Sequence, residues 1–326
     1  MTAEAARRRL LRTLGWAVRV AVAVALLGTL VSMAGLGTSG ALADLSWPPL
    51  LAGLALTPLA VLVRAYNHTL LANRRVRIMR LGDAVRLALV GAGLGLILPA
   101  GASDAARAHY GFRVHGHAED MIVSTVLDRL TSLTAVAAMG VAGGIAAAEY
   151  GLTALAAIIC ALTLVPFVAP GVKVWRLLLK LLAPGITPDD GVLRQVMRPP
   201  AGRLLFVVAV SVVGWLTTYA VVGLVCAAVG ARVGFGYLLA LAPFTSLARM
   251  VPISVGGLGL SELTMAALLI RAGVPDELAA QVSLISMALL ALMPGAAGLV
   301  LVLLRRHQTT SATSQGNDVD TSAEEN

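Results

Sequence analysis

The chain has 326 residues, of which 58% are hydrophobic and only 13% are charged. A soluble globular protein carries roughly 25% charged residues, so this composition excludes a soluble fold with an ordinary polar surface. The formal net charge of +8 would suggest nucleic-acid binding in a soluble protein. Here the arginines stand between apolar runs, as the positive-inside rule expects of a membrane protein, and we expect no nucleic-acid partner.

Six apolar stretches are long enough to cross a bilayer, which takes about 20 helical residues. They cover residues 14–34, 49–66, 121–148, 152–170, 204–230 and 279–304. Two further apolar regions, 84–100 and 236–272, are interrupted by proline and glycine. The sequence therefore predicts an all-α fold, a polytopic transmembrane helical bundle. It forms a single domain over residues 1–306, and a disordered cytoplasmic tail follows over 307–326.

Basic residues are concentrated in alternate segments outside these stretches. Segments 64–83 and 171–203 are rich in arginine, as are both ends of the apolar region, whereas 35–48 has no lysine or arginine. The positive-inside rule then places both termini in the cytoplasm of a multi-pass plasma-membrane protein. All basic segments lie on the same side of the membrane only if 84–100 enters the membrane and returns to the side from which it came. We therefore expect a re-entrant element whose returning leg, about 101–120, packs against protein or lines a polar cavity.

The two interrupted regions share a sequence pattern. LPAGASDAAR and VPISVGGLGLSE each place a proline and small residues before a carboxylate, Asp104 in the first and Glu262 in the second. The two regions would enter the membrane from opposite sides, which predicts an inverted repeat of re-entrant or short-helix hairpins. The alternative is chance, because proline and glycine are common in membrane helices. For 236–272, a re-entrant hairpin and two short spans are both compatible with the charges. The expected helix breaks are Pro99, Gly101, Pro252, Gly256, Gly257 and Gly259.

Charged residues within the apolar regions are candidate substrate-binding residues, because an ionisable side chain in a bilayer is costly to bury. Asp128 and Arg129 are adjacent, so they point in different directions and need different partners. They serve an anion or proton site, or they pair structurally with other helices. Asp104 and Arg107 share a helix face, either as a local ion pair or as half of a polar site.

Arg249 and Glu262 flank the second break. The Arg249 guanidinium suits a lipid phosphate, or it extends to the membrane interface. Glu262 pairs with Arg249, binds a cationic headgroup or a proton, or caps the restarting helix. A helix that restarts after Gly256, Gly257 and Gly259 would also direct its free N–H groups inward, where they can hold an anion.

Neither a catalytic site nor a metal site is predicted. His109, His115 and His117 lie near Glu119 and Asp120, but their spacing fits no standard zinc pattern. Nucleophile-elbow, zinc-protease and P-loop motifs are missing from the sequence. We therefore expect a protein that is not an enzyme and needs no cofactor.

Three motifs carry a family resemblance. PAGASDAARAHY, VLDRLTSL and VPISVGGLGLSE, in this order, resemble the lysylphosphatidylglycerol synthase transmembrane-region family. The resemblance covers roughly residues 14–304 and implies a flippase-like plasma-membrane protein that handles lipids. Aminoacylating members have a separate soluble acyltransferase-type domain. This sequence has none, so we expect it not to synthesise aminoacyl-lipids.

Together these features predict a protein that binds and translocates a lipid or lipid-linked substrate, with an anionic lipid or a lipid-linked sugar as candidates. The alternative is a non-catalytic accessory subunit whose membrane partner is a lipid-modifying enzyme or a glycosyltransferase. A third hypothesis is a membrane-embedded enzyme that acts on headgroups. It would need Asp104, Arg107, Asp128 and Arg129 as its polar cluster.

Overall fold

The structure, a computed structural model, describes residues 3–35, 45–73, 77–98, 102–115, 118–168, 201–251, 253–254 and 257–304. Its helices are α1 (Ala3–Met33), α2 (Trp47–Ala72), α3 (Leu81–Ile97), α4 (Ala102–His115), α5 (Ala118–Ala146), α6 (Tyr150–Val168), α9 (Ala201–Ala228), α10 (Phe235–Met250), α11 (Leu260–Arg271) and α12 (Asp276–Met287). A π-helical turn, η2 (Ala288–Leu292), follows α12, and the helix then continues to Leu304. The tail 307–326 and most of segment 171–203 lie outside the described residues.

Within the described part of the chain, six helical segments are long and apolar enough to cross a membrane. They are Trp16–Met33, Trp47–Ala72, Asp120–Ala146, Tyr150–Val168, Gly202–Ala228 and Asp276–Leu304. They coincide with the six predicted stretches, so the predicted all-α bundle is confirmed. At 1.5 Å per residue, the shortest segment is about 27 Å long, which is close to the roughly 30 Å of a hydrocarbon core.

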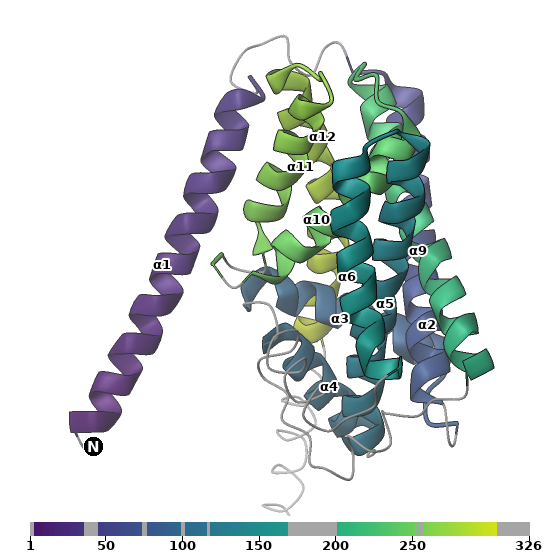
Figure 1. Ribbon diagram of the computed structural model, residues 1–326. Coiled ribbons are helices and arrows are strands. Elements are labelled where there is room, and N and C mark those ends of the chain that lie inside the picture. Colours follow the sequence, from purple (N-terminus) through teal and green to yellow (C-terminus); the bar gives the residue numbers. More distant parts are fainter. Residues whose placement is uncertain are drawn as a thin grey trace, which may run out of the picture.

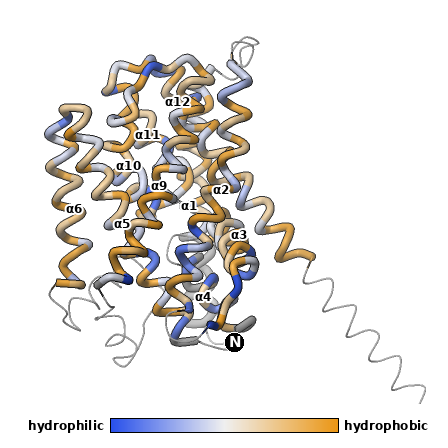
Figure 2. The backbone as a smooth tube through the Cα atoms, turned by 90° about the vertical axis from the view of Figure 1, so that its right-hand side faces the viewer, coloured by the Kyte–Doolittle hydropathy of each residue, from blue (hydrophilic) through white to orange (hydrophobic). Residues whose placement is uncertain are grey.

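One of the most apolar helices lies at the outside of the bundle. The α6 span has a mean hydropathy of 2.3 with 22% buried, whereas the α5 span has 1.3 with 72% buried. A soluble protein buries its apolar residues, so it would show the opposite order. On α6, Leu155, Ile158 and Leu162 are exposed, and Figure 2 shows this largely hydrophobic helix at the edge of the molecule. The exterior is therefore suited to hydrocarbon.

Two pairs of helices extend only part of the way through the bundle (Figure 1). The α3–α4 hairpin lies in the lower half, and the α10–α11 hairpin lies in the upper half. With 14 residues in α4 and 12 in α11, these helices are about 21 and 18 Å long, too short to cross the hydrocarbon core. Region 236–272 is therefore a hairpin of short helices. The relation of the two hairpins as an inverted repeat stays a prediction.

Helix α5 lies at the centre and packs against α2, α4, α6, α9 and α10. Its buried hydroxyl groups are satisfied within the helix. Thr125, Thr131 and Thr134 donate to the carbonyl oxygens of Met121, Leu127 and Leu130 at 2.8–2.9 Å. A helix with this many polar residues is stable in the membrane because protein, rather than lipid, surrounds it.

The last helical segment packs closely against the backbone of α3. A Cβ atom at Gly298 would overlap the carbonyl oxygen of Leu89, and one at Gly93 would lie 2.8 Å from the Leu299 nitrogen. Glycine at both positions lets the two backbones approach, as is usual where membrane helices cross. This contact holds α3 in place.

Substitution of Gly298 by alanine should therefore destabilise the protein. The added methyl group forces two backbones apart, and overpacking of this kind costs about 1–3 kcal/mol. The free energy of unfolding in mixed micelles measures the effect. Gly95→Ala is the matched control, because a Cβ atom there meets nothing within 4 Å. Equal unfolding free energies for the two variants would contradict the packing described.

Single cysteines should report that each hairpin returns to the side it left. In a variant with Cys160 and Cys226 replaced by alanine, cysteines at Arg80, just before α3, and at Asp120, near the start of α5, bracket the α3–α4 hairpin. We expect both to react with an impermeant maleimide from one face of the membrane. Cysteines at the ends of α10–α11 should react only from the other face, and Gly234 and Ala272 are suitable positions. Labelling of one hairpin's two ends from opposite faces would refute this arrangement.

Candidate functional site

A cavity of about 310 Å³ lies within the bundle. Its wall includes side chains from the crossing helices α2, α5, α9 and α12 and from both hairpins. All six charged residues singled out in the sequence line it. These are Asp104, Arg107, Asp128, Arg129, Arg249 and Glu262. The tertiary structure therefore brings the two halves of the predicted site to one place.

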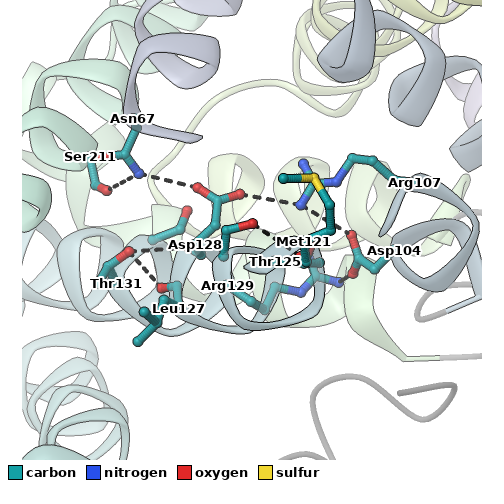
Figure 3. Close-up of polar contacts among 12 residues, drawn as sticks. Asn67, Asp104, Arg107, Met121, Thr125, Leu127, Asp128, Arg129, Thr131 and Ser211 are labelled. Atoms are coloured by element: carbon teal, nitrogen blue, oxygen red, sulfur yellow. Dashed lines mark hydrogen bonds and ion pairs between the residues drawn. The ribbon is translucent and has the colours of Figure 1, made fainter. Parts of the chain in front are cut away.

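The first cluster of charges joins α4 to α5 (Figure 3). Arg129 Nη2 lies 3.1 Å from Asp104 Oδ2, and Arg107 Nη2 lies 3.4 Å from Asp128 Oδ2. The pair within α4, Arg107 with Asp104, is longer at 3.9 Å. The adjacent residues Asp128 and Arg129 thus have separate partners, as their directions on the helix require. Two cross-helix ion pairs hold α4 against α5.

Polar side chains of α2 and α9 complete this cluster. Asn67 Nδ2 lies 3.1 Å from Asp128 Oδ1 and 3.1 Å from Ser211 Oγ. The Asp128 carboxylate therefore accepts from a guanidinium on one oxygen and from an amide on the other. Such full pairing is what makes a buried charge tolerable, because an unpaired one would lose its hydration without compensation.

The second cluster lies at the start of α11. Glu262 Oε2 accepts the Gly259 backbone N–H at 2.7 Å, and Glu262 Oε1 accepts the Ser261 hydroxyl at 2.8 Å. Arg249 Nη2 lies 3.3 Å from the same Oε1 atom. Glu262 is therefore both the partner of Arg249 and a cap of the helix. Gly259 permits this turn because its φ is +87°, a conformation that residues with a Cβ rarely adopt.

This cap is one of the roles that the sequence left open for Glu262. We also predicted that the N–H groups at the start of α11 would be free to hold an anion. Glu262 takes one of these donors, the Gly259 N–H, with its carboxylate in the first turn where the helix dipole favours a negative charge. Gly257 and Gly259 do lie in the turn, with φ of +75° and +87°. The other expected breaks lie outside the described residues, namely Pro99, Gly101, Pro252 and Gly256.

Arg64 is a cavity residue that the sequence analysis missed. We placed it at the start of a basic loop, but α2 continues to Ala72 and Arg64 lines the cavity. Its Cζ atom lies 5.6 Å from the centre of the Trp215 ring, a cation–π contact. A signal was present in the sequence. Thr57, Ala60, Arg64 and Asn67 recur at intervals of three and four residues, so they form one helix face, and all four line the cavity.

The fold and the site define a polytopic α-helical membrane protein whose helices enclose a charged cavity. The chain belongs to the family described as "Lysylphosphatidylglycerol synthase TM region", whose model matches residues 16–304. The family resemblance of the three motifs is thereby confirmed over nearly the whole chain. No curated protein matches the chain.

The pair of Asp104 with Arg129 can be tested by a double-mutant cycle. We expect Asp104→Asn and Arg129→Gln each to destabilise the protein by about 3 kcal/mol, because each removes the nearest counter-charge of a largely covered side chain. The double variant should lose less than the sum of the two, since it removes both charges. Unfolding free energies in mixed micelles give the coupling. Asp276→Asn, at an exposed position, is the control and should cost less than about 1 kcal/mol. Strictly additive losses would show that the two side chains do not interact.

Proposed function

We propose that the protein binds the headgroup of a membrane lipid in this cavity and translocates the lipid between leaflets, without a catalytic step. The observation that carries the proposal is a charged cavity enclosed by helices whose outer surface is apolar. A charged or polar headgroup crosses hydrocarbon only at a large free-energy cost, because it loses its hydration. A polar cavity replaces part of that hydration and lowers the barrier.

The size of the cavity supports a headgroup as the ligand. Its volume of about 310 Å³ equals that of roughly ten water molecules. A headgroup fits this space, whereas two acyl chains do not. In the proposed mechanism the chains stay among the membrane lipids, against the exposed apolar side chains of the outer helices.

The two hairpins are the proposed moving parts. They occupy opposite halves of the bundle, and each contributes charged side chains to the cavity wall. Displacement of one hairpin at a time would open the cavity toward one leaflet and then the other, as in transporters built from broken helices. We place the termini in the cytoplasm of a plasma-membrane protein, because Arg77, Arg80 and Arg86 cluster at the end where α2 leads into α3.

Transport can be measured in proteoliposomes with NBD-labelled phosphatidylglycerol and NBD-labelled phosphatidylcholine. We expect the wild-type chain to accelerate leaflet exchange of at least one of the two, read out by dithionite quenching. Arg249→Gln should slow that exchange roughly tenfold or more, the effect of losing one charge-assisted contact. Glu262 keeps two other hydrogen-bond donors, so this variant should remain folded.

The control for this assay is Arg232→Gln. It makes the same change of charge at an exposed position between α9 and α10 and should exchange lipid like the wild type. Exchange no faster than in protein-free liposomes would refute transport. A lipid-modifying enzyme or glycosyltransferase that co-purifies with such an inactive chain would favour the accessory-subunit alternative.

A further inference from the structure

The charged groups of the cavity differ in how far they are accessible. The carboxylate side chains are nearly covered, with exposed fractions of 16% for Asp104, 12% for Asp128 and 4% for Glu262. Among the arginines, Arg107 is as covered as the carboxylates at 13%, whereas Arg129 is 31% exposed, Arg249 is 47% exposed, and Arg64 is also exposed. All of these side chains line the cavity, and the guanidinium groups of Arg64, Arg249 and Arg129 are the most accessible charged groups among them.

We infer that the cavity binds an oxyanion of the phosphate type, held between Arg64 of α2 and Arg249 of α10. This inference names the ligand class of the site in the proposed function and rests on that proposal for the lipid part of the ligand. It also separates two of the alternatives that the sequence left open. A cationic headgroup would need an accessible carboxylate, and the Glu262 carboxylate is already occupied by three donors.

Arg64 is the strongest element of this argument. Among the residues that the structure describes, no carboxylate lies within 4.0 Å of its guanidinium and no hydrogen bond satisfies its donors. Among the described residues, the charges that act on it are those of Arg249, Arg107 and Arg129 and of one carboxylate, Asp128. An arginine in a membrane-crossing helix needs a counter-charge, because leaving it unpaired is costly. An anion in the cavity would supply that charge.

The neighbours of Arg64 hold its guanidinium in position. The Trp215 ring lies beside it, and Trp215 Nε1 donates to both the carbonyl oxygen and the hydroxyl of Ser132, at 3.1 and 3.0 Å. The aromatic ring is thus fixed to α5. A guanidinium held against a fixed ring keeps its N–H edge free, and that edge binds phosphate oxygens in bidentate fashion.

Arg249 supplies the second cation from a different kind of element. Its contact with Glu262 is long, at 3.3 Å, and nearly half of the side chain is exposed. Arg64 belongs to a crossing helix, whereas Arg249 belongs to a hairpin that ends inside the bundle. An oxyanion between them would therefore connect the hairpin to the crossing helices, so that binding and the position of the hairpin depend on each other.

A matched pair of lipids tests the sign of the charge that the cavity prefers. Phosphatidylcholine carries an anionic phosphodiester, whereas ethylphosphatidylcholine differs only in having that oxygen esterified, which leaves a cationic lipid. Competition against NBD-phosphatidylglycerol on the full chain in detergent measures both affinities. We expect phosphatidylcholine to compete at concentrations at least tenfold lower. Glycerol 3-phosphate forms a third arm. Competition by it shows that a free phosphate suffices, and its failure shows that the phosphate must be that of a lipid.

Variants at the two arginines assign the preference to the proposed residues. Arg64→Gln and Arg249→Gln should each weaken binding of phosphatidylcholine roughly tenfold and reduce its advantage over the esterified lipid. Arg64→Lys keeps the charge and should retain part of the preference, which shows that the site is still folded. Arg232→Gln, outside the cavity, should bind like the wild type.

Two outcomes would overturn the inference. One is equal binding of the two lipids by the wild type, and the other is an unchanged preference in Arg64→Gln. Leaflet exchange measured on the same preparation distinguishes a failure of the oxyanion site from a failure of the proposed function. Equal transport of both lipids would leave translocation intact and refute the oxyanion site. A clear preference in binding without any exchange would support the site and refute translocation.

Discussion

A charge surrounded by hydrocarbon must have a partner, and this constraint organises the interior of the bundle. An unpaired arginine or aspartate in the middle of a membrane helix costs about 3 kcal/mol or more. Asp128 meets the constraint with a guanidinium from α4 and an amide from α2, and the amide also contacts α9. The contacts that neutralise the charge therefore also position three helices around α5.

The two hairpins satisfy the same constraint in different ways. In α3–α4, the shorter contacts of Asp104 and Arg107 lie outside the hairpin, with Arg129 and Asp128 of α5. In α10–α11, Arg249 and Glu262 pair with each other, and Gly259 completes the cap. The first hairpin is thus tied to the central helix by ion pairs at the cavity, whereas the cavity charges of the second pair within the hairpin. At the other end of the second hairpin, Arg271 of α11 pairs with Glu149 between α5 and α6 at 3.3 Å.

The distribution of apolar surface follows from the same hydrocarbon surroundings. The apolar helix α6 is only 22% buried, whereas the least apolar crossing helix, α5, is 72% buried. Polar groups then collect in the interior, where they pair or line the cavity. Glu262 is covered by three donors, whereas the side chains of Arg64 and Arg249 stay exposed, so positive charge remains accessible in the cavity wall.

Hydropathy along the sequence was enough to predict the six crossing helices, because each must supply about 20 apolar residues. Charge in the apolar regions identified Asp104, Arg107, Asp128, Arg129, Arg249 and Glu262, since such residues are rare in membranes unless they are paired or functional. Their pairing was decided only by tertiary structure, because Arg129 meets a residue of α4 that is 25 positions earlier in the chain. Arg64 was not identified as a cavity residue from the sequence, for a related reason. Asn67 and His68 lower the local hydropathy and hide the end of α2, and only the neighbouring helices make that polar face part of a cavity.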